Sequence, residues 1–356
     1  MRAVACFCCG GAVDVSGAGL ARSFAAEVVE PLLDRVFPGL SYATARLGSG
    51  SDVLGLDDTM SRDHDWGCRL TLLVEDGAPV PRIIEVLERE LPQTFQGRPV
   101  RFPVTWDAAR RHNVDTATVR DFAVGRLGVD PLGGLSAVDW LSLTGQSVLE
   151  VTAGPVFTDR TTTLARCRQV LRWYPPDVER YVLAAGWKRL AQQMPFVGRT
   201  AERGDELGSR LLCAELAADV VSLAFTLSRR WQPYAKWRGT VFATLPVAAR
   251  LDLRRVVAAS GWKEREQALA EAAEALLDVQ RQRGLPTPAR AVTPFWDRPY
   301  RTIDEEVVRG LLAEIADPEI RRLPPAGSVE QWVGCVDVLS HAGRRASLRD
   351  VYEHWN

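Results

Sequence analysis

The hydrophobic pattern changes near residue 110, and this change limits the folds open to the chain more than any other feature. Before residue 110, short apolar runs of strand length alternate with helical patterns. After it, strand signals fade and helical periodicity dominates. We therefore expect an α+β protein: a small mixed β-sheet with flanking helices over residues 14–110, followed by a larger all-α helical domain over 111–356 that completes an active-site cleft.

The expected elements can be placed by residue range. Helices are predicted where apolar residues recur at helical spacing, and strands where apolar runs are bounded by turn residues. In the first domain these are a helix over 20–36, strands over 40–47, 70–74 and 99–106, and a helix over 80–91. In the second domain the helical stretches are 164–173, 177–193, 205–230 and 262–283. The first 13 residues, with Cys6, Cys8 and Cys9, are expected to form a disordered leader.

Composition narrows the class of protein. The 356 residues include 44 Lys and Arg against 45 Asp and Glu, so no basic field favours a long nucleic-acid partner. Seven cysteines, an odd number scattered through a long chain, favour reduced thiols over a disulfide framework. No apolar stretch approaches the length of a membrane span. We expect a soluble cytoplasmic protein with a small-molecule or nucleotide substrate.

Two neighbouring motifs carry the chemistry. The turn Gly48-Ser49-Gly50-Ser51 offers backbone N–H groups and hydroxyls to an anion. Asp63-His64-Asp65 follows it, and on a β-strand the two aspartates would share a face while His64 points the other way. Carboxylates suit a hard divalent cation such as Mg²⁺ or Mn²⁺. The motifs therefore predict a site for a metal-bound nucleotide, with His64 in a structural role.

These motifs resemble the signature of the polymerase-beta-like nucleotidyltransferase superfamily. The chain is also similar to a bacterial family of nucleotidyltransferase-like proteins that is defined only as a domain of unknown function. That second resemblance is carried by residues 48–57, 61–67, 204–209 and 233–237. It implies transfer of a nucleoside monophosphate from a nucleoside triphosphate, expected to be ATP, to a small-molecule acceptor in specialised metabolism or antibiotic modification, with release of pyrophosphate.

The resemblance also implies roles for single residues. Ser49 would hold the triphosphate with the backbone of Gly48 and Gly50, and Asp63 and Asp65 would be the metal ligands. In the helical domain, Tyr234 and Lys236 would reach the triphosphate and base. The alternative for that pair is a packed aromatic corner with a solvated lysine.

The superfamily's third carboxylate is missing from the strand predicted over 99–106. Asp107 is the nearest substitute, or it caps a following helix. Asp205 or Glu206 would be a second source of a general base, with capping of the helix over 205–230 as the alternative. If no third acid exists, the chain is a catalytically altered or inactive nucleotide-binding or regulatory protein. A transferase acting on protein or tRNA is a further alternative.

Overall fold

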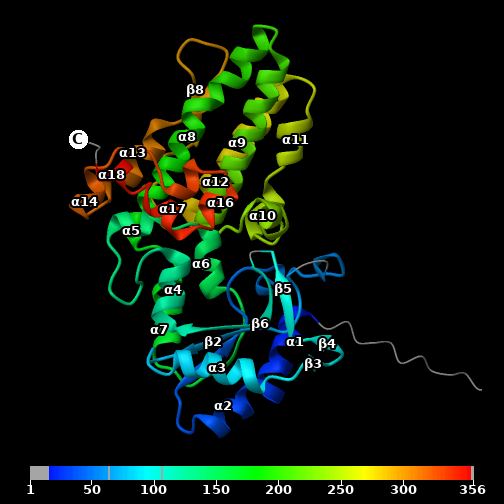
Figure 1. The fold of residues 1–356 in the computed structure, drawn as a ribbon. Helices are drawn as coiled ribbons and strands as arrows, with labels where there is room; N and C mark the ends of the chain where they lie inside the picture. The colour runs from blue at the N-terminus through cyan, green and yellow to red at the C-terminus, as the bar shows by residue number, and fades with distance from the viewer. Residues whose placement is uncertain (1–15, 63–64, 106, 354–356) are drawn as a thin grey trace, which may run out of the picture. The chain divides into compact units, whose positions relative to one another are not determined.

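The computed structural model describes residues 16–62, 65–105 and 107–353, and it divides into two compact units (Figure 1). The first unit comprises the chain up to Phe122 together with Ala153–Ala165. The second comprises Ala123–Thr152 and the chain from Arg166 onward. The sheet-bearing unit thus continues past residue 110, because a long strand follows there, and it is completed by a segment that returns after residue 152.

A five-stranded mixed sheet forms the centre of the first unit. Its strands lie in the order β5-β6-β2-β1-β7. Strand β1 pairs antiparallel with β2 and β7, β2 pairs parallel with β6, and β5 pairs antiparallel with β6. The bounds are β1 Tyr42–Ala45, β2 Arg69–Val74, β5 Arg101–Val104, β6 Asp107–Thr118 and β7 Val156–Asp159. A short hairpin precedes β5, formed by β3 Thr94–Phe95 and β4 Arg98–Pro99.

Two of these five strands are absent from the prediction. The strand expected over 99–106 is β5, and the chain then turns back into β6, where only helical signals were expected. Strand β7 adds to the free edge of β1 from the returning segment. Both strands are rich in polar residues, so neither shows the apolar run by which strands were predicted. The predicted α+β class is confirmed.

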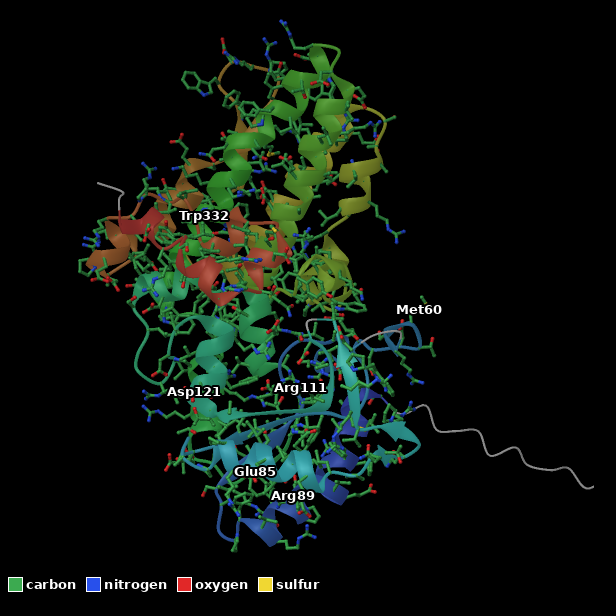
Figure 2. The ribbon with its side chains drawn as sticks, viewed as in Figure 1. Met60, Glu85, Arg89, Arg111, Asp121 and Trp332 are labelled. Atoms are coloured by element: carbon green, nitrogen blue, oxygen red, sulfur yellow. The ribbon has the colours of Figure 1, made fainter. Side chains whose placement is uncertain are left out.

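One face of the sheet is covered by helices. These are α1 Gly17–Phe24, α2 Glu30–Val36 and α3 Val80–Glu90, with a π-helical turn at Ala25–Val29 joining the first two. In the helix predicted over 20–36, apolar residues recur at every fourth position. In an ideal α-helix this spacing moves each apolar residue about 40° around the axis from the one before, and the wider π turn offsets part of that rotation. Glu85 and Arg89 form an ion pair at 3.8 Å on α3, and Figure 2 labels both.

Strand alternation decides which residues face those helices. Leu70, Leu72 and Val74 of β2 and Val114 of β6 belong to one buried apolar cluster with side chains of the three helices. Thr71 therefore lies on the opposite face of the sheet. Because β2 and β6 are parallel and Thr71 is in register with Asp115, Asp115 shares that opposite face.

The second unit is mainly helical. Its centre is α8 Pro176–Glu202 packed on α9 Glu206–Leu227 and α12 Trp262–Gln282, and the four predicted helical stretches correspond to these three and to α7 Thr163–Val170. Trp187 is fully buried and donates a hydrogen bond from Nε1 to Gln280 Oε1 at 2.7 Å. A short hairpin is formed by β8 Val292–Pro294 and β9 Arg301–Ile303. The remaining helices are α4 Val119–Leu127, α5 Ala137–Ser142, α6 Gly145–Thr152, α10 Ala235–Phe242, α11 Leu253–Ala258, α13 Glu305–Ala313, α14 Pro318–Arg321, α15 Val329–Trp332, α16 Val336–Leu339, α17 Ala342–Ala346 and α18 Asp350–Glu353.

Four cysteines lie in the described part of the chain, and all are free thiols. Cys68, Cys167 and Cys213 are buried and Cys335 is exposed. Burial raises the pKa of the Cys68 and Cys167 thiols to about 11, so both stay protonated at neutral pH. Cys6, Cys8 and Cys9 lie outside the described residues. No helix among those described is long and apolar enough to cross a membrane.

Candidate functional site

The Gly48–Ser51 turn follows β1 directly, and its backbone requires glycine. Gly48 has φ of +83° and Gly50 has φ of +139°, both in the region that favours glycine. A Cβ atom on Gly50 would lie 2.2 Å from Asp52 Oδ1. Ser51 begins a short 3₁₀ turn, and its carbonyl accepts hydrogen bonds from the amides of Leu54 and Leu56.

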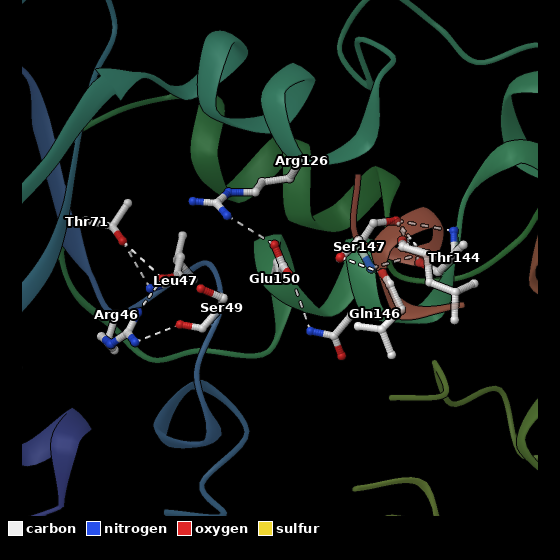
Figure 3. Close-up of polar contacts among 12 residues, drawn as sticks. Arg46, Leu47, Ser49, Thr71, Arg126, Thr144, Gln146, Ser147 and Glu150 are labelled. Carbon is white, nitrogen blue, oxygen red and sulfur yellow. Dashed lines mark hydrogen bonds and ion pairs between the residues drawn. The ribbon is translucent and has the colours of Figure 1, made fainter. Parts of the chain in front are cut away.

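A buried ion pair shapes this turn from inside. Arg46 is 2% exposed, and its guanidinium bonds both carboxylate oxygens of Asp52, at 2.7 and 2.9 Å. The same guanidinium donates to the carbonyls of Leu47 at 2.6 Å and Ser49 at 2.8 Å (Figure 3). Sequence reasoning missed Arg46. Besides its ion pair, Asp52 accepts a hydrogen bond from the amide of Val53.

The ion pair of Arg46 and Asp52 orders the turn but leaves three of its backbone amides without an acceptor in the described residues. Within the described parts of the chain, no acceptor lies within hydrogen-bond distance of the amides of Gly48, Ser49 and Gly50. The carbonyls of Leu47 and Ser49 are turned toward Arg46 instead. Gly48 is buried, Ser49 is partly exposed and Gly50 is exposed. A turn with its carbonyls held inward and its amides free is a suitable anion-binding element.

The loop after the turn is anchored at two further points. Asp57 accepts a hydrogen bond from the amide of Gly17 at 2.6 Å, which ties the loop to the start of α1. Thr71 Oγ1 lies 3.2 Å from the amide of Leu47 and holds the end of β1 against β2 (Figure 3). These contacts fix the turn on the framework of the sheet.

Only one of the two predicted metal ligands is described. Asp63 and His64 lie outside the described residues. Asp65 precedes β2, which begins at Arg69, so the prediction that Asp65 lies on a strand is wrong. Its φ is +54°, and its carboxylate accepts bonds from Thr105, from the amide at 2.6 Å and from the hydroxyl at 2.7 Å. The hairpin of β5 and β6 thus holds the Asp65 carboxylate in place of the predicted strand alternation.

Trp66 follows Asp65 in the sequence, and two arginine guanidiniums lie close to its ring. The Arg98 guanidinium lies 4.5 Å from the ring centre and that of Arg62 lies 4.9 Å from it. No group of three His, Cys, Asp or Glu side chains suited to a metal ion occurs among residues 16–62, 65–105 and 107–353.

Asp107 and Asp115 are the two acids of strand β6 that bear on the missing third carboxylate. Asp107 begins β6 and so caps no helix; its Oδ1 accepts from the amide of Ala109 at 2.9 Å and its Oδ2 lies 3.5 Å from Arg111. Asp115 is exposed and lies in the part of β6 that pairs with β2. At about 3.3 Å per residue, the two carboxylates are about 26 Å apart along the strand. Sequence reasoning missed Asp115 because it ended the strand at Trp106.

The two acids expected from the helical unit have structural partners. Asp205 is the N-cap of α9 and accepts from the amide of Gly208 at 2.7 Å, as the capping alternative predicted. Glu206 bonds the buried guanidinium of Arg265 at 2.9 and 3.0 Å and pairs with Arg210 at 2.8 Å. The hydrogen bond from Arg265 holds the pKa of Glu206 below its usual value. A carboxylate with a lowered pKa and two guanidinium partners is a weak general base.

Tyr234 and Lys236 lie at the start of α10. Tyr234 is the N-cap residue, and its amide donates to Gln146 Oε1 at 3.3 Å. Burial raises the pKa of the Tyr234 phenol. Lys236 is exposed, and its ammonium lies 4.9 Å from the ring centre of Trp237. This is the solvated-lysine arrangement of the alternative, which leaves the nucleotide role of both residues a prediction.

Comparisons with known proteins match this chain to a family model and to solved structures. A family model described as a domain of unknown function (DUF4037) matches residues 140–238, which include Tyr234 and Lys236. A similar solved structure is that of a nucleotidyltransferase-like protein from Exiguobacterium sibiricum 255-15. It shares 13% identity and a TM-score of 0.32, over 76% of this chain and 83% of that chain. A search of curated proteins found no match.

Proposed function

We propose that this protein is a Mg²⁺-dependent nucleotidyltransferase. It would move a nucleoside monophosphate from a nucleoside triphosphate, with ATP the expected donor, to a small-molecule acceptor and release pyrophosphate. One observation carries the proposal: in the Gly48–Ser51 turn, which the buried Arg46–Asp52 pair holds from inside, the amides of Gly48, Ser49 and Gly50 donate no hydrogen bond to any described residue.

The turn fits the phosphates of the donor. Free amides at Gly48, Ser49 and Gly50 are donors that need no reorganisation to meet phosphate oxygens. The Ser49 hydroxyl adds a fourth donor at the same place. Because the Arg46 clamp is buried, the turn keeps this shape before any ligand arrives, which lowers the entropy cost of binding.

The described ligand chemistry fits a divalent cation. Asp65 supplies hard carboxylate oxygens, and each oxygen keeps a lone pair beyond its bond to Thr105. Asp63, two residues away, would be its partner. When bound there, Mg²⁺ would neutralise charge on the phosphates.

We assign the role of general base to Asp115. It lies on the strand next to β2 and on the face of Thr71, whose hydroxyl contacts Leu47 just before the turn. In the transfer, Asp115 accepts the proton of the acceptor hydroxyl while the oxygen of that hydroxyl bonds to the α-phosphorus of the triphosphate. The bond between that phosphorus and the bridging oxygen breaks, and pyrophosphate leaves with the bonding electrons. Asp205 and Glu206 are less suited, because capping and two arginines already occupy them.

The experiment separates binding from transfer. ATP binding with Mg²⁺ is measured by calorimetry, and pyrophosphate release is measured with a pool of small-molecule acceptors. We expect Asp115→Asn to bind ATP normally and to lose about 10²- to 10⁴-fold in release. Asp107→Asn, on the same strand, is the matched control and should keep both. Full release by Asp115→Asn would refute the assignment of the base.

Further outcomes decide between the proposed enzyme and its alternatives. If the wild-type protein binds ATP with Mg²⁺ but releases no pyrophosphate with any pool, the nucleotide-binding module is the better description. Radiolabel transferred from ATP to protein or tRNA would replace the small-molecule acceptor. The double variant Asp63→Asn, Asp65→Asn should lose metal-dependent binding, and unchanged binding would show that the site is misplaced.

A further inference from the structure

A pocket of about 260 Å³ opens within the helical unit, between α8, α9, α10 and the segment around α15. Its wall includes charged and amide side chains from four separate parts of the chain. These side chains include Arg189, Glu215, Asp219, Gln232, Arg238 and Glu330. A volume of this size suits a ligand smaller than a nucleotide, since pockets for drug-sized ligands begin at about 300 Å³.

Arg238 gives the pocket a cation with an open coordination. Within the part of the chain that the structure describes, no carboxylate pairs with Arg238. Arg189, on the same wall, is different: it pairs with Asp219 at 3.1 Å and donates to the carbonyl of Gln331 at 2.9 Å. A half-buried guanidinium without a carboxylate partner is a suitable site for the carboxylate of a ligand.

In a larger pocket of the same unit, two of the lining arginines already have carboxylate partners. That pocket measures about 710 Å³ and is lined by Arg250 and Arg290, among others. Arg250 pairs with Asp278 at 2.7 Å, and Arg290 lies 3.7 Å from Glu274. Arg250 and Arg290 therefore have carboxylate partners, whereas Arg301, which also lines that pocket, bonds Gln267. Arg238 has no carboxylate partner among the described residues.

The pocket also presents acceptors for a cation and for a hydroxyl. Glu215 and Asp219 lie one turn apart on α9, and Glu215 is exposed with no ion pair to any described residue. Gln232 donates from Nε2 to Glu330 at 3.3 Å, while its Oε1 is buried without a donor. A buried acceptor without a partner is uncommon, and an incoming O–H or N–H would satisfy it.

We propose that this pocket binds a compact polar amino acid. Its carboxylate would bond Arg238, its ammonium would face Glu215, and a side-chain hydroxyl or amide would donate to Gln232 Oε1. The proposal requires no nucleotide and does not depend on the proposed nucleotidyltransferase function, although Tyr234 also lines the pocket, so either proposal can fail while the other holds.

The two acids behind the wall support this arrangement. Burial raises the pKa of Glu330 to about 7 and also raises the pKa of Asp219. Glu330 therefore carries only part of its negative charge at neutral pH, which favours an incoming carboxylate, whereas Asp219 stays paired with Arg189. Glu215, farther out on α9, remains as the partner for the ammonium.

The test uses the full chain and each of the twenty L-amino acids as probes. Binding is measured by saturation-transfer NMR and then by calorimetry, with L-serine as the expected type of ligand. L-glycerate replaces the ammonium of L-serine with a hydroxyl at the same configuration, and L-serinamide removes the carboxylate. We expect serine to bind more tightly than both analogues. If none of the twenty amino acids binds at about 10 mM, the proposal is overturned.

Variants locate the contacts. Arg238→Gln should weaken serine binding by about 10- to 100-fold, as loss of a charge-assisted bond requires. Arg254→Gln is the matched control, because Arg254 is an exposed arginine of α11 that does not line the pocket. Glu215→Gln should weaken binding of L-serine but not of L-glycerate. If Arg238→Gln instead weakens only ATP binding, Arg238 belongs to the nucleotide and the proposal is wrong.

Discussion

Replacing Arg46 with methionine should destabilise the sheet unit by about 3–5 kcal/mol, the range for removing one partner of a buried ion pair. Methionine fills much of the same space but carries no donor. The Asp52 carboxylate, 7% exposed, would lose its guanidinium partner, and the carbonyls of Leu47 and Ser49 would lose their bonds at 2.6 and 2.8 Å. The loss should come from uncompensated polar groups rather than from a cavity.

A double-mutant cycle shows whether the ion pair is the cause. Asp52→Asn alone leaves Arg46 buried with a neutral acceptor. The double variant Arg46→Met, Asp52→Asn should cost at least about 1 kcal/mol less than the sum of the single variants, because residues in direct contact couple. Arg35→Met is the control, since Arg35 pairs with Glu90 across solvent at 3.4 Å with 67% of its side chain exposed. It should cost less than about 1 kcal/mol.

The assay must separate the two compact units, because one unfolding transition for the whole chain is not assured. Hydrogen exchange measured by mass spectrometry reports the free energy of opening for peptides of each unit. We expect the loss in peptides spanning β1, β2 and the turn, with little change in α8 and α9. A cost below 1 kcal/mol for Arg46→Met, or additive costs in the cycle, would refute the clamp on the Gly48–Ser51 turn.

Three further predictions concern charge and packing. Burial alone would raise the pKa of Glu179, but two arginines and a Trp173 N–H outweigh it and the pKa is lowered, so the helical unit should lose stability as pH falls below the ordinary value of 4.5. Thermal unfolding from pH 6 to 3 should show a shallower acid loss in Glu179→Gln, and an equal loss would contradict this. Gly154→Ala should destabilise strongly in urea titration, because its Cβ would lie 1.8 Å from the Arg46 carbonyl oxygen, whereas Gly239→Ala in α10, with open space around it, should be neutral or stabilising by up to about 1 kcal/mol. Trp187→Phe should cost about 1–3 kcal/mol in the same titration through the lost bond to Gln280, and no cost would mean that the bond contributes nothing.

Local patterns predicted element type well where a strand or helix buries an apolar face. Helices α9 and α12 fall within the predicted ranges. Strand β2, with Leu70, Leu72 and Val74 in the core, begins one residue before its predicted range, and α8 covers its predicted range but continues to Glu202. Strand β6 did not, because its exposed N-terminal half pairs only with β5 and carries Arg110 and Arg111. The exposed half of a hairpin strand buries no side chains, so it needs no apolar run and its sequence shows no hydrophobic period by which a strand could be predicted.

The sequence by itself determined the division into a sheet-bearing part and a helical part, and the position of a glycine-dependent turn after β1. These follow from local chemistry: hydrophobic period sets element type, and positive φ requires glycine. Only the tertiary structure decided what holds that turn and what lies near it. Arg46 meets Asp52 inside the loop, Thr105 holds Asp65, and the parallel pairing of β6 with β2 places Asp115 on the face of Thr71. Such partners depend on which segments pack together, and no spacing along the chain specifies that.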